Sequence, residues 1–593
     1  MSESKFKLKN VSEPNLLRDL FPYDTVCKLT FDNKNVSMDM PKEIFITDTT
    51  FRDGQQARPP YKIEQIVKIY KLLHLLGGPK GIIRQSEFFL YTEKDQKAVE
   101  KCLEKGYEFP EVTGWIRAVK KDFQLVKDIG LKETGILTSV SDYHIFLKLK
   151  KNRKEAMEAY LDVVRAAIEA GVKPRCHFED VTRADIYGFC VPFAIELMKL
   201  SKESGMPVKI RLCDTMGYGV PFANACLPRS VPKLIQAFRK DAGVPADMLE
   251  WHGHNDFHKV LVNGTAAWLY GCGAINGALL GLGERTGNPP IEGLIIDYIS
   301  MMGNNDIDTT VITDIANYFN KEMNVHIPDN YPFVGSEFNS TKAGIHADGI
   351  SKNEEIYNIF DTTTLLKRPP VVAITDKSGL SGIAHWLNKQ PRFINYRRVS
   401  KFHPGIAKIN KWVQDQYDDG RVTFITNTEM EKLAAKHLPE YYISGLDRIK
   451  DKARHIAEDI IKALCRKSEI KSMDHKIQEP ALSEFINDNP FIQFAYITND
   501  AGVKITKNIT EHINRSAYER IGLHEDFSSR SWFRGPMTDG KVHVTDIFTS
   551  TITEELCITV SAPIREKATG IIKGVLGLDI KFEHLAKTEG EKE

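Results

Sequence analysis

The 593-residue sequence lacks several features that would place it in a specialised class of proteins. No apolar run is long enough to cross a bilayer, and the first residues lack the apolar stretch of a secretory signal. Lysine and arginine together number 80 and aspartate and glutamate 79, so no charge excess points to nucleic acid or an anionic membrane. The nine cysteines include no Cys-x-x-Cys pair, which argues against a disulfide framework. We therefore expect a cytoplasmic protein with no nucleic-acid partner and no membrane partner.

From about residue 43, short apolar segments alternate with amphipathic stretches long enough for crossover helices, such as Ile63–Leu75 and Arg153–Ala170. Eight such β–α units predict an α/β fold of the (β/α)₈ type, a TIM barrel. An open doubly wound sheet is the alternative, but no Gly-x-Gly-x-x-Gly follows the first strand. The expected strands are Ile44–Thr47, Gly81–Arg84, Val112–Ile116, Thr134–Thr138, Pro174–Phe178, Val208–Cys213, Leu249–His252 and Ala274–Leu279.

The composition of the chain changes twice after the expected barrel. Helical patterns first alternate with loops rich in glycine, lysine and serine, and strand-like runs such as Phe491–Thr498 then return. The expected parts are an N-terminal segment (1–42), a catalytic barrel (43–305), a helical subdomain and linker (306–465) and a small α+β domain (466–593) that is regulatory or dimerising.

Polar residues gather directly after the expected strands, where TIM barrels carry their active sites. His252 and His254 stand two residues apart on an extended segment and therefore point to the same side of it. Asp53 follows the first strand, and one carboxylate with two imidazoles suits a divalent Mg, Mn, Co or Zn ion. We predict a metal site of these three residues, with Asn288 close to the ion. Such an ion would polarise the ketone of a 2-oxo acid, and Arg52 would stabilise the alkoxide formed on attack.

Several motifs resemble the signatures of the metal-dependent Claisen-condensing barrels. This superfamily includes 2-isopropylmalate synthase, homocitrate synthase, citramalate synthase, hydroxymethylglutaryl-CoA lyase and the Re-type citrate synthases. The resemblance covers roughly residues 43–400 and implies an acyltransferase that condenses acetyl-CoA with a 2-oxo acid, and a homodimer. The matching segments are Thr47–Gln55, Ser139–His144, Phe178–Asp185, His252–Asp256, Gly283–Asn288 and Lys342–Gly349.

The resemblance also implies roles for individual side chains. It assigns metal binding to the three residues named above and stabilisation of the developing oxyanion to Arg52. It places Glu179 near acetyl-CoA, to help in its deprotonation, and makes His346, with Tyr357, the general base or water activator. Substrate-binding residues are expected at Gln56, Arg84, Arg117, His144 and Thr215.

Arginines near the expected strand ends favour a diacid as the 2-oxo substrate. Arg84, Arg117 and Arg175 could each pair with a second carboxylate, although an ion pair with a neighbouring acid is the simpler interpretation of any one of them. The segments Ile83–Phe89 and Leu269–Gly273 resemble the Re-type citrate synthases most, so we expect oxaloacetate as substrate and citrate as product. Homocitrate synthase and 2-isopropylmalate synthase are the alternatives. A carbon–carbon lyase and a catalytically inactive metabolite sensor are the rival hypotheses.

The last part of the chain resembles Cache sensor domains, notably in Arg530–Phe533, Val544–Phe548 and Gly574–Ile580. The resemblance implies an effector pocket in which Arg530, Trp532 and Asp546 contact a small carboxylate or amino acid. A domain retained for dimerisation is the alternative interpretation.

Overall fold

The computed structural model describes residues 5–303, 306–390, 398–438, 441, 458–489, 492–510, 515–545, 548–549, 556–566 and 568–581. It divides into two compact units, residues 1–341 with 349–371, and residues 342–348 with 372–593. Each unit is described here by itself. Among the described residues, no helix combines the length and the apolar character that a membrane span requires.

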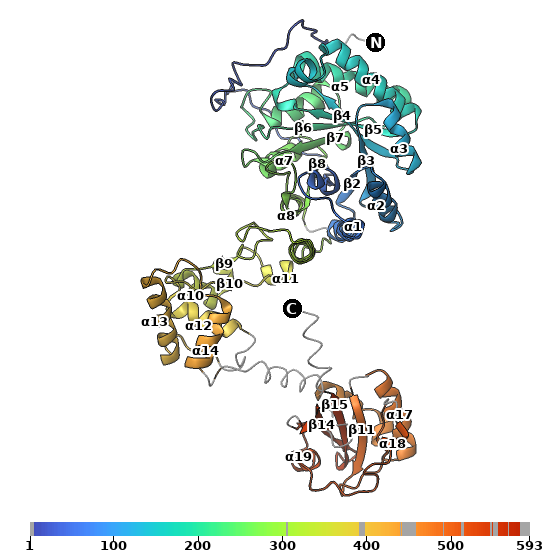
Figure 1. Ribbon diagram of the computed structural model, residues 1–593, viewed down its shortest axis with the longest axis vertical. Coiled ribbons are helices and arrows are strands. Elements are labelled where there is room, and N and C mark those ends of the chain that lie inside the picture. Colours follow the sequence, from blue (N-terminus) through green and yellow to red (C-terminus); the bar gives the residue numbers. More distant parts are fainter. Residues whose placement is uncertain are drawn as a thin grey trace. The chain divides into compact units, whose positions relative to one another are not determined.

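The first unit contains a closed barrel of eight parallel strands in sequential order, surrounded by helices (Figure 1). The predicted TIM barrel is therefore confirmed. The largest difference concerns β2, which was expected to end at Arg84 but continues to Phe89. The strands are β1 (Phe45–Asp48), β2 (Ile83–Phe89), β3 (Glu111–Ile116), β4 (Glu133–Ser139), β5 (Lys173–Glu179), β6 (Lys209–Asp214), β7 (Leu249–Gly253) and β8 (Ala274–Gly277).

The helices of the first unit pack their apolar sides on the barrel, and some of them, such as α2 and α4, begin at a residue whose side chain caps the helix. Asn152 caps α4 by accepting from the Glu155 N–H at 3.0 Å, and the Glu155 side chain accepts in return from the Asn152 N–H. The helices are α1 (Ile63–Gly77), α2 (Glu93–Leu103), α3 (Phe123–Asp128), α4 (Arg153–Glu169), α5 (Val191–Ser204), α6 (Val231–Gln236), α7 (Val260–Leu269), α8 (Ile291–Met302), α9 (Val311–Asn317) and α11 (Thr362–Leu366).

Strand residues alternate between the helices outside and the barrel interior. In β5, Cys176 and Phe178 join the hydrophobic core, whereas Arg175 and His177 reach Glu87 of β2 across the interior. The interior thus holds a layer of three carboxylates and three cations. Because these charges are paired with one another, the layer is electrically balanced and its burial is tolerated. Its members are Glu87, Glu133, Glu250, Arg175, Lys209 and Arg211.

The second unit contains two separate hydrophobic clusters. The first joins the helices α12 (Gly379–Lys389), α13 (Pro404–Asp418) and α14 (Asn427–His437), and α10 (Gly344–Lys352) precedes them. The second lies on an antiparallel sheet of order β11-β15-β14-β12, with β13 (Phe548–Thr549) also paired to β14. The remaining elements of this sheet domain are β11 (Ile492–Asn499), β12 (His543–Val544), β14 (Leu556–Arg565), β15 (Ile572–Lys581), α16 (Ser468–Lys471), α17 (His475–Asn487), α18 (Arg515–Tyr518) and α19 (Ser531–Asp539).

Candidate active site

Asp53, His252 and His254 meet where β1 and β7 end. Asp53 lies in the short helical turn Thr50–Gly54 directly after β1, while His252 lies in β7 and His254 just beyond it. The Oδ2 atom of Asp53 is 3.6 Å from Nε2 of His252 and 3.7 Å from Nε2 of His254. The three ligand atoms lie within 4.8 Å of one another, and all three side chains are buried. The fold thus brings together the three residues that the sequence analysis expects to share one ion.

The chemistry of this triad fits a divalent cation. Among the residues that the structure describes, Asp53 Oδ2 and Asn288 Oδ1 are buried acceptors without a hydrogen-bond partner. Nδ1 of His252 lies 2.7 Å from the side-chain oxygen of Asn276, which requires a proton on Nδ1 and leaves the Nε2 lone pair toward Asp53. Burial lowers the pKa of His252 to about 3, so its imidazole is neutral near pH 7. Neutral imidazoles and an ionised carboxylate are the forms that bind metal.

Arg52 is fixed beside the triad by two carboxylates. Its Nη1 donates to Asp53 Oδ1 at 3.0 Å, and its Nε donates to Glu87 Oε2 at 3.1 Å. Its guanidinium also lies 5.5 Å from the centre of the Trp115 ring. Burial is the largest influence on Asp53 and opposes its ionisation, but Arg52, the two histidines and Asn288 together outweigh it, so the pKa of Asp53 lies below its ordinary value. The remaining guanidinium nitrogen is therefore available to a ligand at the site.

Glu87 is a site residue that the sequence analysis missed. It accepts hydrogen bonds from Arg175 at 2.7 Å and from Arg211 at 2.9 Å, as well as from Arg52. The polar residues Gln85 and Glu87, two positions apart, were the available signal, because alternate residues of a barrel strand face the interior.

One continuous path of hydrogen bonds joins two of the metal-binding candidates through the barrel interior. It passes through the charged layer and then through the Asn276 amide, which donates to Thr47 Oγ1 at 2.9 Å. The path runs from Asp53 through Arg52, Glu87, Arg211, Glu250, Thr47 and Asn276 to His252.

Glu179, the last residue of β5, forms a second polar group with His144. Nδ1 of His144 lies 3.1 Å from Glu179 Oε2, and its Nε2 lies 3.7 Å from Asp180. Burial would raise the pKa of Glu179, but hydrogen bonds from His144 and Ser139 and the charge of Lys148 hold it at about 2. Glu179 is therefore a carboxylate at every physiological pH.

Thr215 and Gln56 lie at the same end of the barrel. Thr215 follows β6, and its hydroxyl accepts from the Asp180 N–H at 2.9 Å. Gln56 is exposed and lines a cavity of about 650 Å³ with the loop 280–287. The substrate-binding roles of both residues stay predictions.

Two predicted arginine positions are wrong. Arg84 is the second residue of β2, and its guanidinium pairs with Glu43, which precedes β1, so it lies at the amino ends of the strands. Arg175 is the third residue of β5 and belongs to the buried charged layer. Arg117 does follow β3, but it is largely exposed and pairs with Asp122 at 3.0 Å. The simpler interpretation of each arginine, a neighbouring acid, is the one observed.

The remaining predicted residues belong to other parts of the chain. His346 is an exposed residue of α10 in the second unit, and Tyr357 is a half-exposed residue of the first unit. Arg530 directly precedes α19, and Trp532 within it packs on Tyr496 with ring centres 5.2 Å apart. Asp546 lies outside the described residues. The roles of these residues stay predictions.

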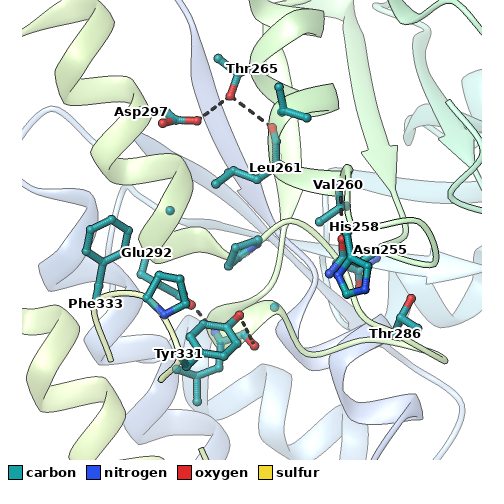
Figure 2. A pocket seen from close by; sticks show the side chains of 17 residues that line it. Asn255, His258, Val260, Leu261, Thr265, Thr286, Glu292, Asp297, Tyr331 and Phe333 are labelled. Carbon is teal, nitrogen blue, oxygen red and sulfur yellow. Dashed lines mark hydrogen bonds between the residues drawn. The ribbon is translucent and has the colours of Figure 1, made fainter. Parts of the chain in front are cut away.

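A second cavity, of about 790 Å³, lies between α7 and α8 with Tyr331 and Phe333 on its wall (Figure 2). Glu292 lines it and is almost fully buried. Its Oε2 accepts from the Leu280 N–H at 3.1 Å, while its Oε1 finds no hydrogen-bond partner in the described part of the chain. Burial raises the pKa of Glu292 to about 7.

We expect the Glu292→Gln exchange to change how stability depends on pH. Since the folded pKa exceeds the unfolded value of 4.5, the wild type loses stability as pH rises from about 4.5 through about 7. At about 1.4 kcal/mol per pKa unit the full loss is about 3.5 kcal/mol. Thermal melting of both proteins between pH 5 and 8 should show that the stability of the variant increases relative to that of the wild type as pH rises. A constant difference between the two curves would contradict the assignment.

Comparison with known proteins agrees with these features. Residues 43–319 match the HMGL-like family, and residues 477–587 match the first PDC sensor domain of methyl-accepting chemotaxis protein-like sequences. The chain is 57% identical over 584 residues to a citrate (Re)-synthase of Syntrophus aciditrophicus, covering 98% of this chain and 93% of that protein. This chain belongs to the HMGL-like family.

Two further relatives share the barrel region of this HMGL-like protein. A citrate (Re)-synthase of Clostridium kluyveri is 55% identical over 436 residues, covering 73% of this chain and 96% of that protein. A 2-phosphinomethylmalate synthase of Streptomyces hygroscopicus is 34% identical over 436 residues, covering 72% and 98%. The predicted family and the Cache-like character of the last domain are both confirmed.

Proposed function

We propose that this protein is a citrate (Re)-synthase, which condenses acetyl-CoA with oxaloacetate to give citrate and CoA. The observation that carries the proposal is the buried Asp53–His252–His254 triad beside Arg52, in a chain 57% identical over nearly its whole length to a protein of that name. Arg84 does not support a diacid substrate, because it lies at the opposite end of the barrel from the triad.

The triad would hold a divalent ion, with Asn288 beside it, and the ion would polarise the ketone of the 2-oxo acid. The ion is Mn, Mg, Co or Zn, since all four accept this set of donors. Arg52 is held in position by Glu87 and Asp53, and it would donate to the oxygen that becomes negative on attack. Because Arg52 is already ordered, this donation requires no rearrangement.

His144 and Glu179 would act on acetyl-CoA. Glu179 has a pKa of about 2 and is therefore a weak base. Its carboxylate would instead orient His144, and a histidine imidazole is the commonest general base in enzymes. His346 and Tyr357 are proposed to act on the thioester stage, where water releases CoA.

Replacing His144 with alanine tests this pair. The exchange removes the hydrogen bond and charge that hold the pKa of Glu179 down, while the burial that raises it stays. We expect CoA release to fall by about 100-fold or more, the range typical of a lost general base. The measurement is kcat/KM for CoA release by the variant and the wild type. An unchanged kcat/KM would separate His144 and Glu179 from the reaction.

Substrate choice is tested by CoA release from metal-loaded protein offered acetyl-CoA with one 2-oxo acid at a time. We expect oxaloacetate to exceed 2-oxoglutarate, 2-oxoisovalerate and pyruvate by at least tenfold in kcat/KM. Turnover with 2-oxoisovalerate alone would replace the proposal by a 2-isopropylmalate synthase. Release with none of the four acids would favour a catalytically inactive sensor.

The proposal includes a cytoplasmic homodimer and an effector site in the PDC-like domain at Arg530, Trp532 and Asp546. The packing of Trp532 on Tyr496 and Phe527 supports a preformed aromatic wall there. Light scattering after gel filtration tests the dimer, and calorimetry with small amino acids tests the effector.

A further inference from the structure

A cavity in the C-terminal sheet domain concentrates positive charge. It has a volume of about 650 Å³ and lies where the helical stretch 458–464, α16, the turn after α19 and the end of β14 meet. Its floor contains Val542, Ala562 and Pro563. Its charged lining residues are Glu458, Lys462, Arg466, Lys471, Lys541 and Arg565.

The five cations of this cavity are poorly neutralised. In the part of the chain that the structure describes, the lining residues form one ion pair, between Lys462 and Glu458 at 3.3 Å. Arg565 donates instead to the carbonyl groups of Gly570 at 2.9 Å and Gly540 at 3.1 Å, which orient its guanidinium without cancelling its charge. The whole chain has a net charge of only +1, so this excess is local.

Lys462, Arg466, Lys541 and Arg565 are exposed, so solvent screens their repulsion, but five cations around one cavity still favour an anionic ligand. The volume lies within the range of about 300–1,000 Å³ that is usual for organic ligands and exceeds the need of one inorganic ion. Arginine forks bind phosphate and carboxylate groups with two parallel hydrogen bonds. The apolar floor offers a surface for the uncharged part of the same molecule.

We propose that this cavity binds a small organic polyanion that carries at least two neighbouring anionic groups. Nucleoside polyphosphates and polycarboxylates share this chemistry. The cavity excludes Arg530 and Trp532, so the site is distinct from the effector pocket expected in the same domain. The helical stretch 458–464 also lines it, and a ligand would thereby bridge this stretch to β14.

Calorimetric titration of the full-length protein with ATP, citrate and inorganic pyrophosphate tests the proposal. The test variant is Arg466→Glu combined with Lys541→Glu, and the control is Lys476→Glu, an exposed lysine of α17 outside the cavity. We expect a saturable site, additional to any binding at the barrel, whose affinity falls steeply with salt and is at least tenfold weaker in the double variant, with no change in the control. Tighter ATP binding would identify phosphates as the ligand groups, and tighter citrate binding carboxylates.

Binding at the barrel would survive in the double variant, so only the loss of a site in that variant supports the proposal. Equal isotherms for the wild type and the double variant would overturn it, as would the absence of saturable binding of all three probes. The milder Arg466→Gln variant, with circular dichroism of each protein, separates lost affinity from lost folding. It should bind severalfold more weakly than the wild type while its spectrum is unchanged.

Discussion

Asp53→Asn should abolish metal retention and reduce CoA release by at least about 1,000-fold. The exchange keeps the shape of the side chain but removes the anionic oxygen that lies 3.6 Å and 3.7 Å from the two imidazoles. Metal polarisation contributes several kcal/mol to reactions of this type, and each 1.36 kcal/mol is worth a factor of ten in rate. Metal per chain after dialysis, measured by elemental analysis, and CoA release should fall together.

His258→Asn is the matched control for the metal experiment. His258 is an exposed histidine on the same segment as His254, and its backbone φ of 56° is one that asparagine accepts readily. The control should retain metal and activity. If Asp53→Asn kept a full equivalent of metal, the ion would have to bind elsewhere and the proposed site would fail.

Glu87→Gln should destabilise the barrel by about 3–5 kcal/mol, the usual cost of leaving a buried charge without its partner. Glu87 faces Arg52, Arg175 and Arg211 at 2.7–3.1 Å, and the variant would leave their charges under-compensated. Urea unfolding combined with hydrogen exchange of peptides from β2, β6 and β7 measures the effect in the barrel itself. Arg52 also loses a support, so CoA release should decline in the same variant.

Glu93→Gln provides the comparison for the stability experiment. Glu93 is exposed at the start of α2 and pairs with Lys97 one turn later, so its loss should leave stability nearly unchanged. Equal effects of the two exchanges would mean that the interior charges contribute nothing beyond an ordinary surface pair.

The sequence analysis located the barrel and the triad because both follow from regular spacing. Strand–helix alternation predicts parallel closure, and parallel closure brings Asp53 to the histidines even though about 200 residues separate them along the chain. The error at β2 has the same origin. Strands of parallel sheets are expected to be apolar, and the interior polar residues Gln85 and Glu87 made the strand look finished at Arg84.

The partners of the buried charged side chains could not be predicted from the sequence, for a different reason. Arg175 reaches acids on β2 and β4, and those partners are set by how far each strand is staggered around the barrel. The raised pKa of Glu292 could not be predicted from the sequence either, because it comes from burial beside a cavity whose lining residues lie as far as about 40 positions away. Local patterns identify which face a residue occupies but not its neighbours across the interior.

The unbroken path from Asp53 to His252 through Glu87, Arg211 and Glu250 limits how this barrel can diverge. No member can change its donor or acceptor character without leaving an adjoining group mismatched, so acceptable sequence changes should come as coordinated sets. A redesign that exchanges Arg211 and Glu250 together for an uncharged pair of matching shape should be tolerated better than either exchange alone. We therefore expect that, in proteins evolved from this chain, substitutions in the barrel interior accompany changes in metal preference.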